Sequence, residues 1–92
     1  MRNYAYPAVF MRDEEDGTYH VLFPDLELTI ESDKIEEAYA YAKASLKAYF
    51  VCCEKYGLEY NEPSDFESIK KSCNKDDLPM IVEAEVEDKD LK

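Results

Sequence analysis

The sequence predicts a small α+β domain, in which an antiparallel sheet with the element order β-β-β-α-α-β carries its helices on one face. Three observations predict this class. Residues 4–31 hold three short runs in which apolar and polar side chains alternate. Residues 33–56 change to the three-and-four spacing of an amphipathic helix, and residues 79–87 return to alternation. A length of 92 residues without a visible repeat or linker predicts one domain over residues 1–92, with a core over 4–87.

The first two alternating runs predict a β-hairpin. Residues 4–12 form the first strand and residues 18–23 the returning strand, while the connecting run 13–17 is acidic and ends in a glycine that accepts a positive φ. Pro7 has no N–H to donate to a neighbouring strand, so it predicts an edge position or an irregular strand. Pro24 ends the returning strand, and residues 26–31 supply a third strand after it.

Two helices are predicted by their capping residues. Asp33 is expected to cap the long helix, because Glu36 three residues later completes a capping box. Gly57 is expected at the other end, as the left-handed residue that stops the helix. A Ser-x-x-Glu sequence that starts at Ser64 predicts a second, short helix over residues 65–72.

The last strand is predicted to have one buried face and one wet face. Its outer positions carry Glu83, Glu85 and Glu87 in alternation with apolar residues. These acids are interpreted either as a solvated face that discourages aggregation at a sheet edge or as a stripe that meets a basic partner. Residues 88–92 are expected to form a frayed, charged tail.

The charge of the chain limits its partners. Asp and Glu number 22 against 11 Lys and Arg, which gives a formal net charge of −11. This charge argues against autonomous binding to nucleic-acid phosphates or to an anionic membrane, and it fits a basic partner or a role in solubility. An odd count of three cysteines, a single histidine and no long apolar run predict a cytoplasmic protein without disulfides, zinc or other cofactors.

Two sets of residues are candidates for contacts with other molecules. Acidic side chains are expected to contact a basic partner, with a solvated hairpin tip as the alternative for the first four. These are Asp13, Glu14, Glu15, Asp16, Asp25, Glu83, Glu85 and Glu87. The sheet face opposite the helices is expected to be apolar, and this face or an exposed edge strand is a candidate for self-association into a homo-oligomer or for docking of a partner. Its candidates are Val9, Met11, His20 and Leu22.

Five motifs in order resemble the HicB antitoxin family over about residues 4–87. They are Tyr6-Pro7-Ala8-Val9-Phe10, the acidic turn ending at Gly17, Phe23-Pro24-Asp25-Leu26, Asp33-Lys34-Ile35-Glu36-Glu37-Ala38, and Glu62-Pro63-Ser64. The resemblance implies a partial ribonuclease H-like fold that is not a nuclease. It also implies a role in binding and occluding a small basic HicA-like toxin, which is an mRNA interferase. Many family members append a DNA-binding domain that is not carried over here, so direct nucleic-acid binding is not expected.

Two other functions remain open from the sequence. One is an orphan HicB-like domain that regulates another process through protein contacts. The other is a ribonuclease H-like enzyme, which would use carboxylates around Mg²⁺. Its candidates are Asp13, Asp25 and Glu31, but acids are common at turns and strand ends, so a structural role is preferred and no catalytic activity is expected.

Overall fold

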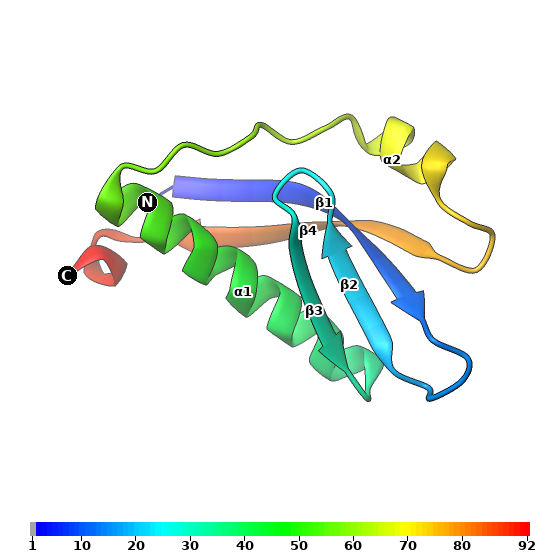
Figure 1. Ribbon diagram of the computed structural model, residues 1–92. Coiled ribbons are helices and arrows are strands. Elements are labelled where there is room, and N and C mark those ends of the chain that lie inside the picture. Colours follow the sequence, from blue (N-terminus) through cyan, green and yellow to red (C-terminus); the bar gives the residue numbers. More distant parts are fainter. Residues whose placement is uncertain (1) are drawn as a thin grey trace.

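The structure, a computed structural model, describes residues 2–92 and consists of four strands, two α-helices and a terminal 3₁₀ helix (Figure 1). In chain order these are β1 (Arg2–Arg12), β2 (Tyr19–Phe23), β3 (Leu28–Ser32), α1 (Ile35–Tyr56), α2 (Phe66–Ser72), β4 (Leu78–Val86) and η1 (Asp88–Leu91). The predicted α+β class, the antiparallel sheet and the element order are therefore confirmed.

The sheet has the strand order β3-β2-β1-β4, with every neighbouring pair antiparallel. β1 is thus a central strand, so the edge position, one of the two alternatives that Pro7 had predicted, is wrong. The register explains how two prolines fit: Pro7 lies opposite Ile81, and Pro79 lies opposite Val9. In an antiparallel ladder, hydrogen-bonded and non-hydrogen-bonded pairs of residues alternate. These two pairs lie two positions apart, so both are of the same kind. Proline has no N–H, so we infer that these are the pairs whose backbone groups point away from the neighbouring strand.

The core lies between α1 and the inner face of the sheet. α1 contributes five buried residues at spacings of three and four, which form the apolar stripe of an amphipathic helix. They are Ala38, Ala42, Leu46, Phe50 and Cys53. The sheet contributes alternate residues of three strands, namely Tyr6, Ala8, Phe10, Val21, Phe23, Val82, Ala84 and Val86. The alternation predicted for the strands therefore assigns their inner faces correctly.

The N-cap of α1 lies one residue after the predicted position. Lys34, and not Asp33, is the N-cap, and its side chain makes no capping hydrogen bond. The hydroxyl of Ser32 instead accepts the Lys34 N–H at 3.4 Å and donates to Glu37 at 3.1 Å. Ser32 thus ties the strand end to the first turn of the helix, so the predicted capping box at Asp33 is wrong.

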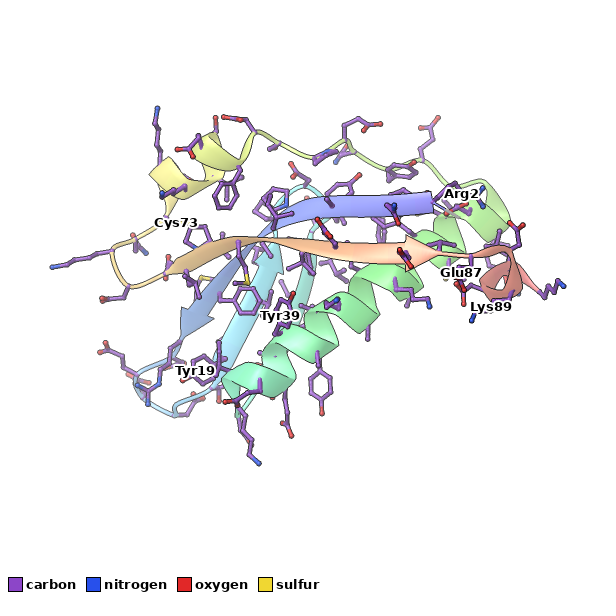
Figure 2. All side chains as sticks on the ribbon, turned by 180° about the vertical axis from the view of Figure 1, so that it is seen from behind. Arg2, Tyr19, Tyr39, Cys73, Glu87 and Lys89 are labelled. Carbon is purple, nitrogen blue, oxygen red and sulfur yellow. The ribbon has the colours of Figure 1, made fainter. Side chains whose placement is uncertain are left out.

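α1 ends at Gly57 as predicted, with φ at 64°. Beyond it, residues 58–65 form an extended segment, here called the strap, that runs beside β1 toward α2 (Figures 1 and 2). The cap of α2 is Asp65, whose carboxylate accepts the Ser68 N–H at 3.3 Å. The predicted cap at Ser64 is therefore off by one residue.

The two helices do not share one face of the sheet, as the sequence had suggested. In both figures α1 and α2 lie on opposite sides of the ribbon formed by β1 and β4, and α2 packs against β4. Pro7 and Val9 point away from α1, yet both are buried. The outer face of β1 is therefore covered near its centre.

The charged tail is ordered as η1. The Glu87 carboxylate and the Asp90 carboxylate cap this short helix reciprocally, with Asp90 accepting the Glu87 N–H at 2.8 Å. Lys47 of α1 lies 3.5 Å from the same Asp90 carboxylate. A salt bridge thus connects η1 to α1. The prediction that residues 88–92 form a frayed tail is therefore wrong.

Candidate functional site

The acidic hairpin turn combines two residues that build it with two that are free to meet a partner. The Asp13 carboxylate accepts the Glu15 N–H at 2.9 Å, and the Asp16 carboxylate accepts the Thr18 N–H at 2.8 Å. The second hydrogen bond holds the pKa of Asp16 below its usual range. Glu14 and Glu15 are exposed and make no salt bridge with any residue from 2 to 92.

The acids of the last strand separate into two groups. Glu83 and Glu85 are exposed on the outer face of β4, opposite Ala5 and Asn3 of β1. Neither makes a salt bridge within the described residues. Glu87 lies beyond β4, caps η1 and pairs with Lys89 at 3.1 Å. The predicted three-residue stripe is therefore a two-residue stripe.

Asp25 holds the strap in place. Its carboxylate accepts hydrogen bonds from the backbone N–H of Ser64, at 2.9 Å, and from the Ser64 hydroxyl. Its carbonyl accepts the Asn61 side-chain amide at 2.9 Å, and the Asn61 carbonyl accepts the Tyr6 hydroxyl at 2.7 Å. Asp25 is thus already engaged within the chain, which favours a structural role over a contact with a partner.

Replacing Asp25 by alanine is expected to release the strap. The change removes both acceptors of Ser64, at a cost of about 1–2 kcal/mol in the free energy of unfolding. Urea unfolding would measure this loss, and limited proteolysis would show faster cleavage within residues 58–65. Glu59 is an exposed residue of the strap, so Glu59→Ala is the matched control. It should change neither the free energy of unfolding nor the rate of cleavage. Equal behaviour of the two variants would contradict the role given to Asp25.

The residues expected to support self-association are only partly available. Val9 is 8% exposed, so it offers almost no surface, because the outer face is covered at this point. Met11, His20 and Leu22 are half-buried. His20 lies 3.5 Å from Glu31 on the neighbouring strand β3, so its imidazole faces an acid of the same sheet face.

Sequence reasoning missed a hollow at the free edge of β4. It has a volume of about 620 Å³, and its walls include Lys43 and Lys47 of α1 together with Glu83 and Glu85 of β4. Residues 3–5 of β1, the strand paired with β4, also line it, so residues of both sheet faces and of α1 border the hollow. The spacing of the two lysines, one helical turn apart, was visible in the sequence, but nothing there placed them beside β4.

One solved structure resembles this chain closely in fold. It is described as a toxin-antitoxin complex from Streptococcus pneumoniae. The likeness covers 91% of this chain and 70% of that chain, with 25% sequence identity and a TM-score of 0.75. No protein-family profile matches the chain, and no curated protein matches it either.

The geometry offers surfaces for binding and no group for metal chemistry among residues 2–92. Nowhere in that range do three or more His, Cys, Asp or Glu side chains gather to hold a metal ion. The carboxylates considered for a nuclease site are dispersed, with Asp13 in the hairpin turn, Asp25 before β3 and Glu31 on β3. Neither α1 nor α2 is long and apolar enough to cross a membrane.

Proposed function

We propose that this chain is a HicB-like antitoxin, which binds and neutralises a small basic HicA-like toxin by covering its RNA-binding surface. The observation that carries the proposal is the likeness to a chain of a toxin-antitoxin complex over 91% of the present chain. The ordered motifs of residues 4–87, which resemble the HicB antitoxin family, supply the finer assignment of this proposal. In this proposal the protein is cytoplasmic, forms a homo-oligomer and has no catalytic role.

Charge complementarity supports a basic partner. A toxin that cleaves mRNA must attract phosphates, so its surface should be basic. The net charge of this chain is −11, and its exposed acids include Glu14, Glu15, Glu83 and Glu85. Opposite charges speed the encounter of two proteins, and salt weakens the effect. We therefore expect the association rate to fall by about tenfold or more when the ionic strength rises from roughly 0.05 M to 0.5 M.

The test is co-expression with the neighbouring gene. A small basic protein encoded beside this chain should arrest growth when induced alone, and the present chain should restore growth by forming a complex. Leu46→Asp places a charge in the core, where Leu46 is fully buried, and should abolish the rescue. Absence of any toxic neighbour, or lack of binding between the purified proteins, would contradict the proposal. Capture of an unrelated protein by this chain would favour the orphan regulatory domain instead.

A further inference from the structure

We propose that the free edge of β4 is the surface that binds the basic partner, by accepting an added strand that carries Lys or Arg at alternate positions. The proposal rests on the proposed function for the identity of the partner. Its chemistry depends only on β4, on α1 and on the hollow between them. β4 is a terminal strand in the order β3-β2-β1-β4, so one of its sides has no strand partner among residues 2–92.

The backbone of β4 presents a defined set of groups at this edge. The pairs that contain Pro7 and Pro79 direct their backbone groups away from the β1–β4 interface, because proline cannot donate there. Ile81, Glu83 and Glu85 share the position type of Pro79, since each lies an even number of residues from it. Their N–H and C=O groups therefore point to the open side, where a strand can pair with them.

The side chains at this edge select a basic strand. Glu83 and Glu85 stand on the outer face beside the uncharged residues Ala5 and Asn3, without an ion pair among the described residues. An added strand places its outer side chains next to these two carboxylates, at the distances of cross-strand pairs. Lysine or arginine at alternate positions would neutralise both.

A second copy of β4 fits this edge poorly. Antiparallel pairing of two copies brings their acids together in three of the central registers, with Glu83 opposite Glu83, Glu83 opposite Glu85, or Glu85 opposite Glu85. Like charges directly opposite each other destabilise a sheet. Registers that avoid this place Pro79 in the new ladder, where it has no N–H to donate. The edge is thus protected against self-pairing and left open to a strand of opposite charge.

The hollow provides space for the other face of the added strand. Lys43, Ala44 and Lys47 of α1 line it on the inner side of the sheet. A fifth strand would lie beside β4 with its inner side chains against Ala44 and the aliphatic stems of the lysines. Small or aliphatic inner residues therefore suit this position, in alternation with basic outer ones.

The first experiment uses a synthetic peptide of alternating lysine and valine as the probe. Amide hydrogen exchange of the full chain is followed by NMR with and without the peptide. The amides of Ile81, Glu83 and Glu85 should exchange about tenfold more slowly with the peptide, because they point to the free edge. The amides of Val82 and Ala84 already face β1 and should not change. The same peptide with glutamate in place of lysine should protect none of them.

Matched variants separate charge from backbone. Glu83→Lys with Glu85→Lys should weaken peptide binding by about tenfold or more, whereas Glu14→Lys with Glu15→Lys, the same change in net charge, should weaken it less than about threefold. Glu83→Pro removes the N–H that points to the open edge of β4. The hydrogen bonds between β1 and β4 should remain, because Pro79 already occupies the same kind of position in this strand. The Glu83→Pro variant should bind more weakly than Glu83→Gln, which removes only the charge.

Each outcome decides the proposal. Protection outside β4, or equal losses in both lysine pairs, would overturn it. Protection of the same three amides by raising the protein concentration alone would show that a second copy occupies the edge, and would also overturn it. In co-expression, rescue that survives Glu83→Lys with Glu85→Lys would refute the edge and leave the proposed function standing. Peptide binding at the edge without rescue by the unaltered chain would refute the function and leave the edge standing.

Discussion

Replacing Phe50 by alanine is expected to lower the free energy of unfolding by about 3–5 kcal/mol, the usual cost of removing a buried phenylalanine. Phe50 is fully buried on α1, and its ring lies at the centre of an aromatic cluster. It stacks on Tyr4 with 3.9 Å between ring centroids and meets Tyr49 and Tyr60 edge-on at 5.1 and 4.8 Å. The change therefore loses several ring contacts as well as buried area.

The effect is large for a domain of this size, whose total stability should be on the order of 5–14 kcal/mol. Thermal unfolding would show a decrease in Tm of roughly 12 °C or more, at about 4–8 °C per kcal/mol. Tyr41→Ala on the same helix is the matched control, because Tyr41 is 49% exposed and should change Tm little. Equal shifts for the two variants would contradict the position of Phe50 in the core.

The protein is expected to lose stability between pH 10 and pH 12, and Tyr6 should account for much of the loss. Its side chain is 2% exposed, and burial raises the pKa of Tyr6 from 10.0 to about 12. The unfolded chain releases this proton near pH 10, whereas the folded chain retains it. The stabilisation is thus complete below pH 10 and is lost as the pH approaches 12. A pKa that is higher by one in the folded chain corresponds to about 1.4 kcal/mol, so a rise from 10.0 to about 12 makes the loss from Tyr6 on the order of 3 kcal/mol.

Urea unfolding at several pH values up to about 11.5 would measure this loss. Burial also raises the pKa of Tyr4 and of Tyr49, so the whole chain should lose more than Tyr6 alone supplies. Tyr6→Phe should be less stable near neutral pH by about 1 kcal/mol, from the lost hydrogen bond to Asn61, but its stability should fall less steeply above pH 10. Tyr56→Phe, at a position 66% exposed, should follow the unaltered chain. Parallel curves for all three would refute the assignment.

The elements of this fold were predictable because their signals are local. The alternation of apolar and polar residues in β1, β2 and β4 and the apolar stripe of α1 could each be recognised from the residues of that element alone. The cap of α1 was not predictable, because Lys34, a residue type that does not favour the N-cap, occupies this position, and the hydroxyl of Ser32, two residues earlier, accepts its N–H. Nor was the central position of Pro7, because the register that accommodates it depends on β4, far along the chain.

In the candidate site, too, the features with a local signal were predicted and those that depend on distant residues were missed. Exposed glutamates on β4 were predicted from alternation alone, and the structure places Glu83 and Glu85 there. The role of Asp25 was missed, because its partner Ser64 is 39 residues away. The burial of Val9 was also missed, since alternation along β1 shows only that its side chain points away from the predicted helix, and not whether that face is covered.

The central strand of this sheet has a consequence for synthesis of the chain. β1 is made well before its longest partner, β4, in whose ladder Arg2 pairs with Val86 and Phe10 with Leu78. While the ribosome still holds β4, the emerging chain lacks Val82, Ala84 and Val86 from its core, and β1 has one open side. Closing this long loop costs chain entropy before any contact repays it. The domain can therefore complete its folding only after β4 has left the ribosome, and until then β1 is an exposed edge accessible to chaperones and to other nascent chains.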